Sequence, residues 1–548
     1  MPRLSRRHTG HLASLVIIAL SLQSCGVVVR QTTQVVKQVQ AGSLRYQGRL
    51  GPLTDTEKAW AKTAWRYVVN NTQEQTGLVN AVDRYPTTTV WHIGDYLAAL
   101  VAARELGLID KLEFDQRLSR VLGFLGSMDL AAKQVPNRIY NTKTGTMVNE
   151  NNQVGEAGWS AADNNRLLIW MKTVGEYYPE YQEYLDKAVL RWRYCNVVAD
   201  CEPAYHQLRQ KKVELGRVEG RSGYQDYTIP GFTLWGFQQV TPDEDATPMT
   251  YVNDTSLLYE DMNTRQKGGI NPLMAMPYLY LGMEFGWDRA TALSGSTRND
   301  GHIDLKTQAQ NVYNAQEQRW KVDKVYTARS DHQLSGPPYK LYDSIFSNGY
   351  GWNSLTEKSE YYPQYALVST RVVFGMWVLY NTHYTDQLMK ITEALFDSKK
   401  GWYEGRYEAS GAYEPVLTLS TNAGVLEALL YKTRGPLYRG HEQTGFFQRI
   451  REDVFEQYDN HPVRPATPPP APKPKVTPRP VQKRAPVQNN GGCCAPQIRY
   501  VEKPVVKTVY VDKPVIKKVY INTCKPTKPK AKPKKVVRKK TPTPQDCK

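Results

Sequence analysis

The chain has 548 residues, with 71 lysines and arginines against 53 aspartates and glutamates, and a formal net charge of +18. This charge is unevenly distributed: residues 461–548 hold 22 basic and 3 acidic residues, whereas residues 25–460 are mildly acidic. The basic excess therefore belongs to one terminal segment, which argues against a nucleic-acid-binding surface on the main body.

The first residues have the features of a secretion signal. Three arginines within the first seven residues precede an apolar stretch at 12–22, which is too short to span a bilayer as a stable helix. It ends in Leu-Gln-Ser followed by Cys25, which resembles the lipobox of bacterial lipoproteins. We expect residues 1–24 to be removed as a signal peptide and Cys25 to carry the lipid anchor. The alternative is an ordinary signal peptide with a chance cysteine. Gly26 at the next position favours, by analogy with known lipoproteins, the outer membrane.

A polar tether over residues 25–53 leads into a long helical region. Thr54 and Glu57 are spaced as in a capping box, which predicts a helix start. Apolar residues at helical spacing then predict a series of helices. They are expected over 54–70, 91–106, 110–128, 160–170, 179–195, 271–286, 304–322, 361–382, 384–397 and 420–433.

Long connections rich in glycine and aromatic residues separate several of these helices. They cover residues 137–158, 216–236, 331–358 and 401–415. Connections of this length are usually functional. The pattern predicts an all-α fold over residues 54–440: an (α/α) toroid of helical hairpins with long aromatic loops, in which a few short strands can occur.

The chain ends differently. Residues 441–460 close the domain, and residues 461–548 are rich in proline and lysine, with a ten-residue near-repeat that begins at Tyr500 and again at Tyr510. Such a segment cannot bury a core, so we expect it to be disordered. It is either a solvated spacer or a ligand for an anionic envelope polymer; a strand added to a partner's sheet edge is a third option. An exported lipoprotein rarely meets nucleic acid, so no nucleic-acid partner is expected.

The cysteines agree with export. Cys195 and Cys201 lie six residues apart, a spacing that suits a local disulfide, with a zinc pair as the rival interpretation. The four cysteines of the tail are open to pairing within the chain or between chains. The sequence holds no phosphate-binding glycine loop or serine-nucleophile elbow, so neither a cofactor nor a metal is predicted.

Four segments together resemble a known family. They are WHIGDYLAAL from Trp91, GWSAADNNRLLIW from Gly158, EGRSGY from Glu219 and GWYEGRYE from Gly401. In this order and spacing they resemble the bacterial domain-of-unknown-function family 3131, a glucoamylase-like group, over about residues 54–440. The resemblance implies an (α/α) toroid similar to that of glycoside-processing enzymes, with a central cleft lined by the long loops.

One position departs from the pattern of that family. The resemblance implies an acidic residue directly after Trp91, where this chain has His92. Either Asp95, one helical turn further on, substitutes for it, or the acidic role is absent. His92 itself is interpreted as a packing histidine, because no further ligand residue lies at metal-binding spacing.

Glycoside hydrolysis requires two carboxyl groups, one protonated and one ionised, on either side of the scissile bond. Acidic residues within the aromatic loops are the candidates. We predict the catalytic residues to be Asp163, Glu219, Asp331 and Glu404, from a wider set that also includes Glu156, Asp226 and Glu408. We predict the substrate-binding residues to be Trp91, Asp95, Trp159, Arg221, Tyr224, Trp402 and Arg406.

Each candidate also has a structural interpretation. Asp163 stands where a helix cap places its acidic residue, and Glu219 and Arg221 are spaced to form an ion pair. Glu404 and Glu408 can be solvated residues ahead of a helix. The sequence therefore supports two functions. The favoured one is a glycoside hydrolase or transglycosylase acting on a glucan or exopolysaccharide; the other is a non-catalytic envelope scaffold that binds a glycan or a protein.

Overall fold

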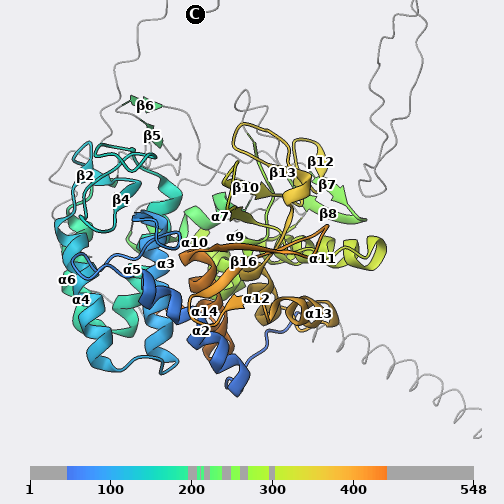
Figure 1. Cartoon of the computed structure of the whole chain (residues 1–548), viewed down its shortest axis with the longest axis horizontal. Helices are drawn as coiled ribbons and strands as arrows, with labels where there is room; N and C mark the ends of the chain where they lie inside the picture. Colours follow the sequence, from blue (N-terminus) through green and yellow to red (C-terminus); the bar gives the residue numbers. More distant parts are fainter. Residues whose placement is uncertain are drawn as a thin grey trace, which may run out of the picture. The chain divides into compact units, whose positions relative to one another are not determined.

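A computed structural model of the chain describes residues 46–194, 207–209, 212–214, 223–236, 249–259, 270–294 and 303–440 (Figure 1). The signal peptide, the lipidation site Cys25, the pair Cys195 and Cys201, and the basic tail lie outside these residues. The same is true of Glu219 and Arg221. Among the described helices, none combines the length and apolarity that a bilayer-spanning segment requires.

Most of the predicted helices are confirmed. The helices are α2 (Asp55–Asn71), α3 (Val90–Glu105), α4 (Lys111–Ser127), α5 (Ala161–Tyr177), α6 (Gln182–Leu190), α7 (Tyr224–Thr228), α8 (Pro230–Leu234), α9 (Met276–Glu284), α10 (Trp287–Ser294), α11 (Leu305–Asp323), α12 (Thr370–Leu379), α13 (His383–Thr392) and α14 (Leu419–Arg434). The short helices α7, α8 and α10 were not predicted. The helix expected over 361–382 is shorter, because its first part forms a 3-10 turn, η5 (Pro363–Tyr365), and a strand.

The predicted capping box at the start of α2 is present. The Glu57 N–H donates to Thr54 Oγ1 at 3.3 Å, and the Thr54 N–H donates to Glu57 Oε2 at 2.8 Å. Two of the N–H groups that a helix start leaves without partners are satisfied in this way.

Six helices form a closed ring within the described residues. α3 packs on α5, α5 on α7, α7 on α9, α9 on α12, α12 on α14, and α14 returns to α3. The other helices pack outside this ring: α2 on α14, α4 and α6 beside α3 and α5, and α13 on α12. This arrangement is that of a helical toroid with an inner and an outer layer.

Burial explains which helices are inside. α9 and α12 are buried on every side, and α3 is buried continuously from Ile93 to Ala103. By contrast, α4 buries only the stripe that includes Phe114, Leu118 and Leu122. A helix that is apolar all round must be enclosed, whereas an amphipathic helix covers it.

The structure also contains many short strands, so the prediction of an all-α chain is too narrow. They are β1 (Thr87–Thr89), β2 (Leu130–Ala131), β3 (Val135–Pro136), β4 (Ile139–Asn141), β5 (Gln207–Arg209), β6 (Lys212–Glu214), β7 (Met249–Val252), β8 (Thr255–Leu258), β9 (Asp331–Gln333), β10 (Lys340–Asp343), β11 (Phe346–Ser347), β12 (Tyr350–Gly351), β13 (Ser354–Leu355), β14 (Leu367–Ser369), β15 (Phe396–Asp397), β16 (Gly401–Tyr407) and β17 (Tyr413–Leu417). All of the described pairings are antiparallel.

The strands occupy the connections that lead into the N-termini of inner helices. β1 runs directly into α3, β14 directly into α12, and β17 ends two residues before α14 begins. The larger sheets have the orders β13-β10-β9 and β14-β16-β15, with β17 on β16. In Figure 1 most of the labelled strands lie above the helices. We call this strand-bearing end, where the N-termini of α3, α7 and α12 meet, the mouth of the ring.

A buried charge cluster joins the inner helices below the mouth. Arg166 of α5 is fully buried and forms ion pairs with Asp95 of α3 at 2.9 Å, with Glu284 of α9 and with Glu427 of α14. It also donates a 2.7 Å hydrogen bond to the Tyr227 hydroxyl of α7. One cation thus links five of the six inner helices. We call this set of residues the Arg166 cluster.

The Arg166 cluster has more acids than bases. Burial raises the pKa of Glu427 well above its ordinary value, against the opposing effect of Arg166, and burial also raises the pKa of Glu284. Glu427 therefore keeps its proton to a higher pH than an ordinary glutamate.

The cluster also requires close packing: a Cβ added to Gly94 of α3 would lie 2.9 Å from Arg166 Cγ.

We predict that Glu427→Gln changes how stability depends on pH. In the native chain Glu427 retains a proton that the unfolded chain releases near pH 4.3, so its contribution to the free energy of unfolding declines as the pH rises above that value. The neutral amide of glutamine removes this pH-dependent contribution to the free energy of unfolding. Denaturant unfolding at pH 5, 7 and 8.5 measures the difference, with the exposed Glu74→Gln as control. Equal pH slopes in Glu427→Gln and in the unsubstituted chain would contradict the assignment.

Candidate functional site

Asp331 is the central acidic residue of the mouth. It begins β9, and its side chain remains 17% exposed. Arg371, in the first turn of α12, donates from Nη2 to Asp331 Oδ1 at 2.7 Å and to its carbonyl oxygen at 2.6 Å. Lys340 Nζ lies 3.4 Å from Oδ2, and the Tyr224 hydroxyl donates to Oδ1 at 3.2 Å. The carboxylate is therefore held by two cations and a phenol.

An aromatic wall stands beside Asp331. Trp91, in the first turn of α3, is half-buried and meets the edge of Tyr224 with ring centroids 5.8 Å apart. Tyr227 and Tyr280 pack on Trp91 at 5.8 and 6.0 Å. The Arg166 guanidinium lies 5.5 Å from the Trp91 ring. The wall thus rests on the Arg166 cluster, and the structure brings the predicted residues Trp91, Tyr224 and Asp331 together.

His92 belongs to the same place. It is half-buried, and its Nδ1 lies 2.7 Å from the Thr89 hydroxyl. Burial lowers the pKa of His92 to about 4; the charges of Lys340 and Arg371 lower it further, while Asp95 and Asp331 oppose them. The imidazole is therefore uncharged at neutral pH. Position 92 therefore lies within electrostatic reach of Asp331.

Glu404 supports the strand that carries Asp331. The strand β9 pairs with β10 on one edge, where the Leu334 N–H donates to the Tyr339 carbonyl. The N–H groups of alternate residues point to the other edge. There the Gln333 N–H donates to Glu404 at 3.2 Å and the Ser335 N–H donates to Glu414 at 3.0 Å. Two carboxylates thus take the place of a neighbouring strand.

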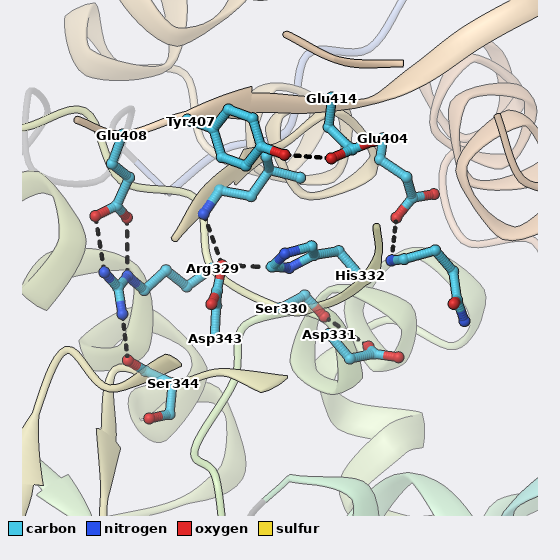
Figure 2. Close-up of polar contacts among 12 residues, drawn as sticks. Arg329, Ser330, Asp331, His332, Asp343, Ser344, Glu404, Tyr407, Glu408 and Glu414 are labelled. Atoms are coloured by element: carbon cyan, nitrogen blue, oxygen red, sulfur yellow. Dashed lines mark hydrogen bonds and ion pairs between the residues drawn. The ribbon is translucent and has the colours of Figure 1, made fainter. Parts of the chain in front are cut away.

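Both of these carboxylates are buried and fully engaged. Glu404 is 2% exposed and also accepts from the hydroxyls of Thr418 and Thr421. Glu414 is 1% exposed and accepts from the Tyr407 hydroxyl (Figure 2). In this geometry Glu404 positions β9 through the Gln333 N–H, and its predicted catalytic role stays a prediction.

A second layer of charges backs the site. His332 lies on the opposite face of β9 from Asp331, with its Nδ1 3.3 Å from Asp343 Oδ2 (Figure 2). Burial raises the pKa of Asp343. The predicted candidate Glu408 is buried and pairs with Arg329 at 2.7 Å and with Arg319 at 2.9 Å. These groups fix the connection rather than line the mouth.

Three predicted substrate-binding residues are enclosed in the structure. Asp95 is 0% exposed and bonds Arg166 and the Ser420 hydroxyl. Trp159 is 2% exposed and Trp402 is 0% exposed; both belong to the main hydrophobic core. Their side chains face inward in this structure, and their predicted contact with a substrate stays a prediction.

The remaining candidates lie elsewhere in the connections. Asp163 is half-buried at the third position of α5, where its N–H donates to the capping Ser160 hydroxyl at 3.1 Å. Arg406 of β16 packs against the turn at Gly411. Asp226 is buried on α7, and Glu156 is half-buried in the connection before α5.

Sequence reasoning missed Arg371 and Lys340. Arg371 had a recognisable signal, because it is the single charged residue of the apolar ten-residue helix α12. A charge in such a helix requires a partner. Lys340 had no such signal. Among the described residues, no group of three His, Cys, Asp or Glu side chains is arranged as metal ligands.

Comparison with known proteins agrees with this architecture. The model of the family DUF3131, described as proteins of unknown function, matches residues 59–435. The chain belongs to this family. The matched residues include all six helices of the ring, from α3 to α14, and the match confirms the resemblance found in the sequence. A search of curated proteins finds no match.

Several solved structures are similar to this DUF3131 protein. A candidate glucoamylase of Bacteroides fragilis has a TM-score of 0.50 at 12% identity, over 74% of this chain and 97% of that one. One from Bacteroides caccae has a TM-score of 0.49 at 11% identity, over 70% and 94%. An endo-beta-1,2-glucanase of Chitinophaga pinensis has 0.49 at 11%, over 71% and 94%. The first likeness shows a glucoamylase-like fold.

We predict that Glu404→Ala loosens β9 while Glu404→Gln largely preserves it. Alanine removes the acceptor of the Gln333 N–H, and a hydrogen bond to a charged group contributes about 1.5–3 kcal/mol. Glutamine retains one acceptor oxygen. Hydrogen exchange of the peptide that contains Gln333 is expected to accelerate by at least tenfold in Glu404→Ala. The exposed Glu393→Ala serves as control. Unchanged exchange at Gln333 in Glu404→Ala contradicts the positioning role.

Proposed function

We propose that this protein is a carbohydrate-active protein of the cell envelope, a glycoside hydrolase or transglycosylase acting on a glucan or exopolysaccharide. The observation that carries the proposal is the meeting of Asp331 with the wall of Trp91 and Tyr224 at one end of the helical ring. Sugars bind through their hydroxyl groups and through apolar faces that stack on aromatic rings, and this mouth offers both kinds of contact. The glucoamylase-like fold supports the same function.

Bond cleavage requires a carboxylate and a carboxylic acid on either side of the glycosidic bond. Asp331, paired with Arg371 and Lys340, takes the part of the carboxylate. Glu219 takes the part of the acid. It precedes Tyr224 by five residues in the sequence. Tyr224 in turn donates a hydrogen bond to Asp331.

A second function, glycan binding without catalysis, is favoured by a specific observation. Asp95 and Glu404, two of the predicted acids, are buried and engaged with protein donors. By contrast, the Asp331 side chain at the mouth remains 17% exposed. A scaffold with this mouth, a lipid anchor and a basic tail for anionic envelope polymers links layers of the envelope.

We predict that Asp331→Asn abolishes turnover and leaves the fold intact. A positioned acid or base contributes about 10²–10⁴-fold to a rate, so a loss of at least about 100-fold is expected. The full chain is incubated with soluble α-1,4-, β-1,2-, β-1,3- and β-1,4-glucans, and reducing ends are measured.

The control for this experiment is Asp288→Asn, which changes an exposed aspartate on the outer helix α10. Glu219→Gln tests the acid in the same assay, and thermal unfolding checks the fold of each variant. Turnover that survives in Asp331→Asn rules out the assigned site. Binding of a glucan without any product supports the scaffold instead.

We further propose that the protein is held on a membrane, with the outer membrane favoured, by lipid on Cys25. Several acyl chains make a stable anchor, because each buried CH₂ contributes about 0.8 kcal/mol. Cys25→Ala is therefore expected to move the protein from the membrane fraction to the soluble fraction and to abolish labelling by radioactive palmitate. A Cys25→Ala protein that still fractionates with membranes refutes the anchor.

A further inference from the structure

The hydrogen bond between Thr89 and His92 restricts where the imidazole carries its proton. Thr89 is the N-cap of α3, and its Oγ1 accepts the backbone N–H of His92 at 3.4 Å. The same oxygen lies 2.7 Å from His92 Nδ1. Its own proton has no other acceptor among the described residues. The arrangement that gives each group a partner has the hydroxyl donating to Nδ1, which leaves the imidazole proton on Nε2.

The surroundings keep this imidazole uncharged. His92 lies in the first turn of α3, where the helix dipole disfavours a cation. The groups that face it are the cations Lys340 and Arg371 and the acids Asp95 and Asp331. Asp95 and Asp331 are already engaged by Arg166 and by Arg371. The acids are thus paired with other cations, and a protonated His92 would add a further positive charge to an occupied site.

The His92 Nε2–H has no acceptor among the described residues. Two further polar groups near His92 also lack a hydrogen-bond partner there. Arg371 Nε and the Tyr280 hydroxyl are buried without a hydrogen-bond partner in the described part of the chain. Arg371 is 5% exposed and Tyr280 0%. A buried donor without a partner costs about 1–3 kcal/mol, and a bound ligand is one way in which such a donor gains its hydrogen bond.

We infer that His92 binds the saccharide as an uncharged hydrogen-bond donor, offering Nε2–H to a sugar oxygen while the ring of that sugar lies against Trp91. This inference rests on the proposed function and adds the specificity of its site. The site selects neutral, hydroxyl-rich rings. A charged histidine would instead favour an anionic sugar, and an acid at this position would donate a proton to the leaving group.

The tautomer can be measured without any ligand. The full chain is labelled with ¹⁵N in its nine histidines, and the signal of His92 is assigned by its loss in His92→Gln. We expect the Nε2–H pattern, unchanged between pH 5.5 and 8. An Nδ1–H pattern, or a charged imidazole at pH 7, overturns the inference whatever the substrate is.

Binding is then measured with maltoheptaose and with a β-1,2-glucan oligosaccharide as probes. Loss of one neutral hydrogen bond weakens binding by about three- to tenfold, which we expect for His92→Phe. His92→Gln, which retains a side-chain N–H donor, is expected to lose less. The exposed His383→Phe on α13 is the control, and thermal unfolding of each variant separates loss of binding from loss of fold.

The outcomes separate the two proposals. Equal binding of a probe by His92→Phe and by the unsubstituted chain, with both folded, overturns the donor role while the proposed function stands. The Nε2–H tautomer together with no binding of either probe, and no turnover in the glucan panel, overturns both the saccharide ligand and the proposed function. A shift of the His92 Nε2 signal on binding supports the inference.

Discussion

The Arg166 cluster is the interaction on which the rest of the structure depends. Arg166 is fully buried, and it binds side chains from α3, α7, α9 and α14 at once. Removing one partner from a buried ion pair typically costs about 3–5 kcal/mol, because the other charge is left unpaired. The cluster therefore fixes how the inner helices meet. Trp91 lies directly against the Arg166 guanidinium. Arg166 therefore also fixes the position of the aromatic wall of the site.

Above this cluster, the acidic residues are sorted by what they face. Glu408 faces two arginines and is buried. Glu404 and Glu414 face backbone N–H groups at a strand edge. Asp331 also has cationic partners, but part of its side chain still faces solvent. Only this last kind of acid can meet a ligand without rearrangement. The role of each acidic residue in the site therefore depends more on the exposure of its side chain than on its residue type.

The sequence predicted the outer layer well, because amphipathic periodicity and caps such as Thr54 and Glu57 act locally. The helix predicted at α12 was too long, because an apolar run of residues does not indicate where a strand ends and a helix begins. Asp331 and Tyr224 were predicted from their aromatic, glycine-rich surroundings, and Trp91 from the first motif of the family resemblance. The same surroundings also pointed to residues that turn inward into the core. Whether a loop side chain faces the core or the solvent depends on segments that are remote in sequence. Contacts with such segments leave no local pattern in the sequence.

The strands in this helical protein follow from the site itself. In a ring of helices, the connections between the helices form the mouth. Each backbone N–H and C=O group in those connections needs a hydrogen-bond partner. Short antiparallel hairpins such as β9–β10 supply most of them. Where β9 has no neighbouring strand, Glu404 and Glu414 accept its N–H groups instead. The same bonds that satisfy the backbone hold Asp331 at a fixed place. In this helical scaffold, the short strands of the loops therefore position the carboxylate of Asp331.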